Sequence, residues 1–417
     1  MRRLLAFFLG IQKRSALRKL RRRGLSPEQA AAEAVVCGRA WEEFCDTLKD
    51  AGGAVLGFDS PDDPFTRAEG FRYLSRLVRA GLENFVEGGD PGAPNLRRLV
   101  HETVKMGNDN PDFYYRNAVI DGRRKYRITG TLGTTPFIIF STQDGDYADS
   151  GGAAMPIAGQ ITTDQMRIGE DGAVEIVLSP EPEGENWLRT TPETRMVMIR
   201  ELFGDRERET PSQLRVEPLD GPAAPSPLTA AHLENGLKKT GQLVAGASLM
   251  FARWSRDFSK TVNELPRFDQ AKSDAAGGDP NMVYYHSYWR LPPDGALVVE
   301  ATPPECATWN FVLSNHWLES LDYRYSRIHV NKHTAAYRPD GSVRIVIAAE
   351  DPGLPNWLDP QGHEFGSMCF RWNRAETHPQ PRIRPVDLGV LEEFRDEERR
   401  APSTPLAYEP QRPGGES

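Results

Sequence analysis

One block of sequence occurs twice in this chain, and the fold has to accommodate both copies. Residues 171–188 read DGAVEIVLSPEPEGENWL, and residues 340–358 read DGSVRIVIAAEDPGLPNWL. Each copy has an Asp-Gly turn, an alternating strand-like run, an acidic loop with Pro and Gly, and a closing Asn-Trp-Leu. Repetition at a fixed spacing, here about 170 residues, marks a duplicated structural unit.

A second pair of matching segments lies upstream. NPDFYYR (110–116) matches DPNMVYYH (279–286), and this alignment sets His286 opposite Arg116. Around both copies, apolar residues alternate with polar ones and Asp-Gly dipeptides supply hairpin turns, as in antiparallel strands. The duplicated units are therefore expected over 108–220 and 278–392.

An antiparallel β unit has to bury one face, and two related units can bury faces against each other. We expect an α+β protein with two duplicated antiparallel β-sandwich-like modules and with helices packed before and between them. A ligand cleft is expected at the junction of the modules, as at domain interfaces generally. The repeated Trp187 and Trp357 are expected to fill the cores, with Asn186 and Asn356 bonding loop backbone.

The other segments are assigned around the modules. Ser26-Pro27 and Ser226-Pro227 each place an N-cap residue before a Pro, which is typical of a helix start. Trp41, Phe44 and Cys45 follow with helical spacing. The assignments are a basic amphipathic arm over 1–25, a helical region over 26–107, a linker and helix over 221–277, and a disordered tail over 393–417.

Charge and motif content exclude several classes of function. The net charge of −8 makes general nucleic-acid binding unfavourable, because phosphate contacts need clustered Lys and Arg. The sequence has no GxSxG, GxGxxG or GxxxxGK[ST] motif, which argues against α/β-hydrolases and common nucleotide-binding folds. We assign no cofactor. The four cysteines show no CxxC spacing and fit a reducing, cytoplasmic location.

The N-terminal 23 residues carry nine basic side chains, no acidic one and a short apolar stretch. This composition fits a basic amphipathic segment that lies on an anionic membrane surface. A solvated or core-docked arm explains it equally well. The chain has no run of about 18 apolar residues, so no spanning helix is expected. The sequence sets no expectation for the oligomeric state.

The pattern of NPDFYYR, then SLDYRYSRIHVNKHTAAYRPDGSVRIVIAAEDPGLPNWL, resembles the bacterial "domain of unknown function 1214" family. The resemblance is best over about 280–375 and weaker over the first copy. It implies a β-rich fold and no particular activity. Members often carry a companion module numbered 1254, but the first module here looks like a diverged copy of the second.

Six of the eight histidines lie in the second copy, and the first copy has none between 102 and 231. Imidazole is an acid–base group near neutral pH, so His316, His329 and His333 are the expected catalytic residues. His329 and His333 are four residues apart, which puts both rings on one face of a helix or a strand. A metal held by these rings is an alternative, but no CxxC or HExxH motif supports it and we assign none.

The segment SNHWLESLDYRYSR (314–327) is dense in polar and aromatic residues, which suits the rim of a pocket. An interface between the duplicated units is enriched in the same residue types. The residues expected to bind ligand are His286, Asn315, Trp317, Glu319, Asp322, Arg324 and Asn331.

These observations predict a small-molecule-binding protein with its ligand, an apolar, aromatic or sugar-like metabolite, in a cleft of the second module. It would be a lyase, hydrolase or isomerase of catabolism if the histidines are catalytic. The alternative is a non-catalytic binding or scaffold protein, peripheral to a membrane if the basic arm binds one.

Overall fold

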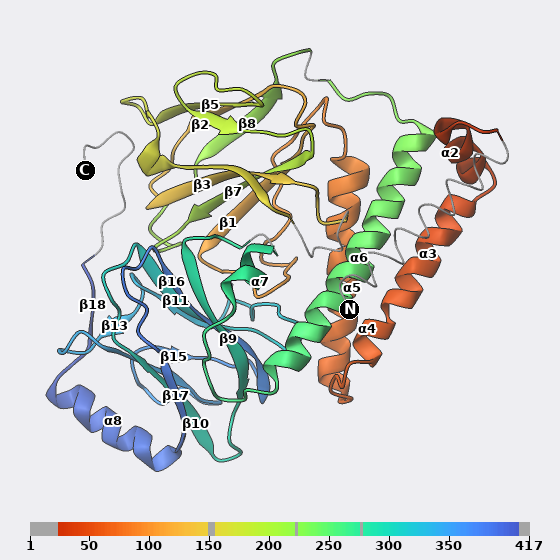
Figure 1. Ribbon diagram of the computed structural model, residues 1–417. Coiled ribbons are helices and arrows are strands. Elements are labelled where there is room, and N and C mark those ends of the chain that lie inside the picture. The colour runs from red at the N-terminus through yellow and green to blue at the C-terminus, as the bar shows by residue number, and fades with distance from the viewer. Residues whose placement is uncertain (1–23, 149–154, 222–223, 276–277, 408–417) are drawn as a thin grey trace.

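The computed structural model describes residues 24–148, 155–221, 224–275 and 278–407. Most of the helices run along one side of the molecule, and two β modules are stacked beside them (Figure 1). The α+β architecture with two duplicated sandwich-like modules is therefore confirmed. The predicted basic arm falls almost entirely on residues 1–23, which lie outside the described part of the chain.

All of the helices except the last precede the modules or connect them, and the last follows the second module. Ser26 caps the first one, since Gln29 N donates to Ser26 Oγ at 3.2 Å, as predicted. The long helix begins later than predicted, at Ala230, because Thr229 is its N-cap and accepts from His232 N at 3.1 Å. The helices are α2 (Pro27–Val36), α3 (Arg39–Ala51), α4 (Gly53–Leu56), α5 (Pro64–Gly81), the π-helical η1 (Leu82–Glu87), α6 (Ala230–Phe258), α7 (Gln270–Ala275) and α8 (Leu388–Arg400).

The first module is a sandwich of two four-stranded sheets. One sheet has the strand order β1-β7-β3-β4, and the other has the order β6-β5-β2-β8. Apolar side chains of both sheets, including Ile128, Phe140 and Ile176, form one buried core between them. The elements are β1 (Phe113–Val119), β2 (Tyr126–Thr131), β3 (Phe137–Asp144), β4 (Ile157–Thr162), the 3-10 turn η2 (Thr163–Gln165), β5 (Ala173–Ser179), β6 (Trp187–Arg189), β7 (Thr194–Leu202) and β8 (Gln213–Pro218).

The second module repeats this arrangement strand for strand. Its sheets have the orders β9-β16-β11-β12 and β15-β14-β10-β17, which are the orders of the first module in corresponding elements. Both modules also contain one parallel pair, β5 with β6 and β14 with β15. The strands are β9 (Met282–Arg290), β10 (Gly295–Ala301), β11 (Thr308–Leu313), β12 (His329–Asn331), β13 (Ala336–Tyr337), β14 (Val343–Ile347), β15 (Trp357–Leu358), β16 (Phe365–Asn373), β17 (Arg382–Asp387) and β18 (Thr404–Pro405).

The repeated Asn-Trp-Leu closes each parallel pair. Asn186 and Asn356 each donate through Nδ2 to two backbone carbonyls, as predicted. The prediction that Trp187 and Trp357 fill the cores is wrong. Both rings are only half-buried. Each indole nitrogen donates to a carbonyl at the end of the neighbouring strand, Ser179 O in one module and Ala348 O in the other, and the following leucines occupy the cores instead.

The strand registers shift the alignment of NPDFYYR (110–116) with DPNMVYYH (279–286) by one residue. Tyr115 pairs with Arg200 across β1 and β7, and Tyr284 pairs with Arg371 across β9 and β16. The structural counterpart of Tyr115 is therefore Tyr284 rather than Tyr285. His286 accordingly corresponds to Asn117, not to Arg116 as the sequence alignment set it. A shift of one residue matters because it moves a side chain to the other face of the sheet.

One buried cluster joins the helices to both modules. It contains Leu77 of α5, Leu243 of α6, Ala148 of the first module and Trp317 of the second. Gly70 on α5 permits this contact, because a Cβ there would lie 2.6 Å from the Trp317 ring. The helices thus serve as a common wall for the modules.

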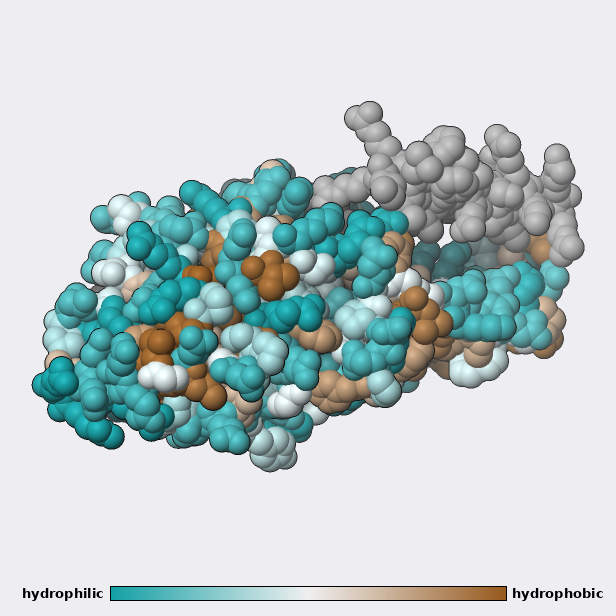
Figure 2. Space-filling view, turned by 90° about the horizontal axis from the view of Figure 1, so that it is seen from below, coloured by the Kyte–Doolittle hydropathy of each residue, from teal (hydrophilic) through white to brown (hydrophobic). Residues whose placement is uncertain are grey.

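The outer side of the helical wall is less apolar than the spacing of apolar residues in the sequence suggested. Phe44 of α3 is buried, but Trp41 is 60% exposed and Cys45 is exposed too. Seen from below, the surface is mostly hydrophilic, with separate apolar patches (Figure 2). Among the described helices, none combines the length and the apolar character that crossing a membrane requires.

The prediction of disorder over 393–417 is wrong for residues 393–407. Helix α8 continues to Arg400 and packs Leu391 and Phe394 on the outer face of the β15-β14-β10-β17 sheet. Beyond it, β18 pairs with β13. The polar composition misled because a few apolar side chains, with an ion pair between Glu397 and Arg344, hold α8 on the sheet. Residues 408–417 lie outside the described part of the chain.

Candidate functional site

The two modules meet through the outer faces of the β1-β7-β3-β4 and β9-β16-β11-β12 sheets. Phe113 and Leu202 of the first module form an apolar cluster with Met282 of the second. Next to this cluster, and against α6, lies a cavity of about 180 Å³ lined by both modules and the helix. The cleft expected at the junction is therefore present, although it lies between the modules rather than within the second one.

Corresponding residues of the two copies line this cavity together. The outer faces of β1 and β7 in one module, and of β9 and β16 in the other, bring the same positions to it. Each copy contributes a Tyr–Arg pair that is matched across neighbouring strands. The corresponding lining residues are Asn110 and Asp279, Phe113 and Met282, Tyr115 and Tyr284, and Arg200 and Arg371.

The remaining wall is mainly apolar. Helix α6 contributes one side of it, and methionines and aromatic rings from other segments complete it. Flexible thioethers and aromatic faces adapt to an apolar ligand without requiring a particular hydrogen bond. The apolar lining residues include Val100, Met106, Tyr147, Met155, Met198, Leu243, Ala247, Met250, Phe251, Trp254 and Phe268.

His286 is the only residue predicted for the site that lines this cavity. Its ring stacks between Phe258 and Tyr284, with centroids 5.3 and 5.4 Å away. Asn108 Nδ2 lies 3.1 Å from Nδ1, and since the amide nitrogen only donates, the ring proton is on Nε2. That nitrogen lies 3.9 Å from Cys369 Sγ.

Burial keeps this imidazole and the neighbouring thiol uncharged. Burial, helped by the charge of Arg371, lowers the pKa of His286 to about 3. Burial also raises the pKa of Cys369 to about 11. A reactive cysteine needs the thiolate form near neutral pH, and this thiol stays protonated. The imidazole is a weak base and carries its proton on the nitrogen nearest Sγ, so the two side chains do not suit a nucleophile and its base.

Arg371 is the most unusual polar group of the lining, and the sequence prediction missed it. The residue is 3% exposed, and it donates to Asn108 O at 2.6 Å and to Asn310 Oδ1 at 3.3 Å. In the described part of the chain, no carboxylate lies within 4.0 Å of its guanidinium. A guanidinium has five N–H donors, so most of its capacity is unused.

Two tyrosine hydroxyls add further donors. Within the described residues, the hydroxyls of Tyr147 and Tyr284 have no hydrogen-bond partner. Burial raises the pKa of Tyr147 to about 12 and raises that of Tyr284 further. Both phenols therefore keep their protons, and each can donate one hydrogen bond to a ligand.

His316, predicted to be catalytic, lies elsewhere. It follows β11 and packs against α6, where its Nδ1 lies 2.8 Å from Tyr288 Oη and 3.2 Å from Ser255 Oγ. Burial, together with the charge of Arg67, lowers the pKa of His316 to about 4. Its partners are those of a neutral ring that fixes the loop to the helix, and it does not line the cavity.

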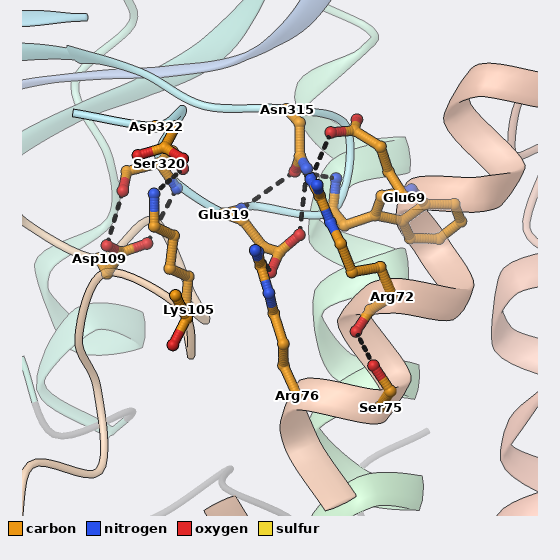
Figure 3. Close-up of polar contacts among 12 residues, drawn as sticks. Glu69, Arg72, Ser75, Arg76, Lys105, Asp109, Asn315, Glu319, Ser320 and Asp322 are labelled. Atoms are coloured by element: carbon orange, nitrogen blue, oxygen red, sulfur yellow. Dashed lines mark hydrogen bonds and ion pairs between the residues drawn. The ribbon is translucent and has the colours of Figure 1, made fainter. Parts of the chain in front are cut away.

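The loop that carries His316 is held by α5 on one side (Figure 3). Trp317 Nε1 donates to Thr66 O at 2.8 Å. Glu319 is 1% exposed and accepts from Arg76 Nη1 at 2.6 Å and from Asn315 Nδ2 at 3.1 Å. Burial raises the pKa of Glu319, although Arg76 opposes this change. These predicted ligand-binding residues join the second module to the helices instead.

Lys105 and Asp109 approach the same loop from the other side (Figure 3). Lys105 Nζ donates to the carbonyls of Ser320 and Leu321, both at 2.7 Å. Asp109 accepts from Ser320 N at 2.9 Å and from Ser320 Oγ at 2.7 Å. Polar and aromatic density in 314–327 therefore reflects an interface. The alternative interpretation placed that interface between the duplicated units, but only the Asp109 contacts join them, and the others are to α5 and Lys105.

His329 and Asn331 contact the first module. Asp112 Oδ1 accepts from His329 Nε2 at 3.1 Å and from Asn331 Nδ2 at 2.9 Å, and Oδ2 accepts from Asn310 Nδ2 at 2.7 Å. Burial alone would raise the pKa of Asp112, but His329 and the amide donors outweigh it and lower the pKa. The carboxylate thus binds the two modules together.

The last three predicted residues lie nearer the surface. Asp322 and Arg324 form an ion pair of 2.6 Å, and both side chains are more than a third exposed. His333 donates its backbone N–H to Asn331 Oδ1 at 2.9 Å. No group of three His, Cys, Asp or Glu side chains suited to a metal ion occurs in the described residues. The predicted residues therefore do not form one site.

Beside Asp112, Glu209 gives a prediction about pH. Its buried Oε2 accepts from Gly204 N at 2.8 Å, and burial raises its pKa to about 7. A folded-state pKa above the unfolded value means that stability falls as pH rises towards 7. We expect Glu209→Gln to raise the free energy of unfolding by about 2 kcal/mol at pH 8 and by much less at pH 5.

Denaturant unfolding at the two pH values measures this difference. Glu207→Gln, which removes an exposed carboxylate two residues away, is the matched control and should change neither value. An equal gain for Glu209→Gln at both pH values would contradict the raised pKa.

Comparisons with known proteins agree with the duplicated fold. The family model DUF1214, "Protein of unknown function", matches residues 116–205 and 296–376, one segment in each module. A crystal structure of an uncharacterized protein from Burkholderia cenocepacia is 46% identical with a TM-score of 0.83, covering 86% of this chain and 99% of that one.

A second solved structure, the VPA0106 protein from Vibrio parahaemolyticus, is 13% identical with a TM-score of 0.43, covering 76% of this chain and 98% of that one. That similarity is too low to compare the sites. No curated protein matches. The matches in both modules and the 46% identity over nearly the whole Burkholderia cenocepacia protein show that this chain belongs to the DUF1214 family.

Proposed function

We propose that this protein binds a small molecule in the cavity between its two β modules. The observation that carries the proposal is the lining itself, in which corresponding tyrosines and arginines of both copies face one apolar-walled space beside α6. Largely apolar cavities with a few converging polar groups are the usual form of small-molecule sites.

Binding is favoured over catalysis by the chemistry of the lining. General acid–base catalysis works best with a group whose pKa lies near the working pH. The pKa of His286, which lines the cavity, lies well below that range, and the pKa of Cys369 beside it lies well above. None of His316, His329 and His333 lines the cavity. The non-catalytic alternative is therefore the stronger proposal, with the ligand at the module junction.

A substitution that fills the cavity tests this proposal. Ala247 of α6 is buried and lines the space, so Ala247→Leu should occupy part of it and keep or raise the melting temperature. Ligand-observed NMR with a library of ring-sized compounds of varied charge should detect binding to the wild type and its loss in the variant.

Ala245→Leu, at a half-buried position of the same helix outside the lining, is the matched control and should bind like the wild type. The proposal fails if no compound binds the wild type, or if Ala247→Leu binds the same compounds with equal affinity.

A further inference from the structure

We propose that the ligand is a small organic monocarboxylate, with its carboxylate on Arg371 and its apolar body against α6. This inference rests on the proposed function, since it names the chemistry of the molecule in the same cavity. It is carried by the incomplete neutralisation of a buried guanidinium.

Two neighbouring arginines are each paired with a carboxylate, unlike Arg371. Arg116, on the core side of β1, has Glu201 at 2.6 Å. Arg374, three residues after Arg371, has Asp164 at 2.9 Å. Among the described residues, the hydrogen-bond partners of Arg371 are only a backbone carbonyl and an amide oxygen. Burying an unpaired charge costs several kcal/mol, and an anion in the cavity would remove that cost.

The donors around the space suit a carboxylate. A guanidinium presents parallel N–H groups that match both oxygens of a carboxylate. The guanidinium lies 5.9 Å from the ring centroid of Tyr284, whose hydroxyl has no partner in the described part of the chain. Arg371 would supply the paired contact, and the Tyr284 hydroxyl would supply one more hydrogen bond.

Two acids also line the cavity, and their oxygens are already engaged. Asp109 accepts two hydrogen bonds from Ser320. Asp279 accepts from Asn281 N at 3.0 Å and from Asn373 Nδ2 at 3.2 Å. These donors offset part of the negative charge of the two acids, whereas Arg371 still has unused N–H groups for an anion. The lining therefore favours an anion.

The volume limits the apolar body to about one ring. A protein cavity of about 150 Å³ accepts benzene, and the space here is about 180 Å³. A six-membered ring carrying one carboxylate therefore fits. Met250, Phe251 and Trp254 of α6 provide the surface for the ring.

Isothermal titration of the full chain with four probes tests the charge. The probes are benzoate, cyclohexanecarboxylate, benzamide and benzylamine. Both carboxylates should bind, with benzamide at least about 10-fold weaker because it lacks the charge-assisted hydrogen bonds. If benzamide or benzylamine binds as well as benzoate, the carboxylate assignment is overturned while the cavity remains a binding site.

Substitutions locate the contact. Arg371→Met should weaken benzoate binding about 10- to 100-fold and leave benzamide binding nearly unchanged. Arg290→Met, which removes an exposed cation from the same sheet, should leave both unchanged. Should Arg371→Met fail to fold, Tyr284→Phe removes only a hydroxyl and is expected to weaken benzoate about 3- to 10-fold. Benzoate affinity that survives Arg371→Met or Tyr284→Phe overturns the inference.

Discussion

Glu319→Ala is expected to lower the free energy of unfolding by about 3–5 kcal/mol, because it leaves a largely buried Arg76 without its partner. Glu319 is fully enclosed, and Arg76 donates to it at 2.6 Å from α5. Asn315 would lose an acceptor in the same step. Denaturant unfolding followed by circular dichroism measures the loss.

Two further variants show whether the pair explains the effect. Arg324→Ala breaks the exposed ion pair with Asp322 and should cost less than about 1 kcal/mol. The double variant Arg76→Met with Glu319→Met should recover much of the stability, because buried ion pairs can often be replaced by apolar residues. A Glu319→Ala variant as stable as the wild type would contradict this structural role of the ion pair.

Asp112→Asn is expected to cost about 2–4 kcal/mol, because one carboxylate accepts all three hydrogen bonds from the second module. An amide in its place accepts through one oxygen only, and its nitrogen faces the donors of Asn310, His329 or Asn331. The loss should appear at neutral pH as lower resistance to urea.

The same substitution also changes the dependence on pH. The folded-state pKa of Asp112 is lowered, so its contribution is complete above the unfolded pKa of about 4 and is lost as pH falls through the folded value. The variant should not show this acid-dependent loss. Asp164→Asn, at the exposed inter-module ion pair with Arg374, is the control. Equal losses for both variants would contradict a special role for Asp112.

The fold could be predicted from the sequence because the duplication leaves local signals that survive divergence. The Asp-Gly turns, the alternating strands and the Asn-Trp-Leu segments sit at matching places in both modules. To predict the fold it is enough to know which face of each strand is apolar. The prediction failed at α8, where a mostly polar stretch is held by Leu391, Phe394 and the half-buried Val390.

The candidate site could not be predicted as readily, because it depends on register and on which surfaces meet. Enrichment of histidines pointed to one module, but His316 and His329 hold interfaces on different sides of it. The useful signal was an arginine inside an apolar strand in each copy, in MVMIREL (196–202) and MCFRWN (368–373). Recognising Arg200 and Arg371 as counterparts requires the strand pairing, which the spacing alone misplaced by one residue.

Corresponding side chains of two covalently joined copies surround a single space, and this arrangement allows asymmetry that an identical pair of chains would not. In a homodimer, any substitution appears at both ends of a shared chamber. In a tandem chain each end varies independently, as Asn110 against Asp279 and Phe113 against Met282 already do. Such a cavity can bind a ligand in one orientation and not in the reverse one.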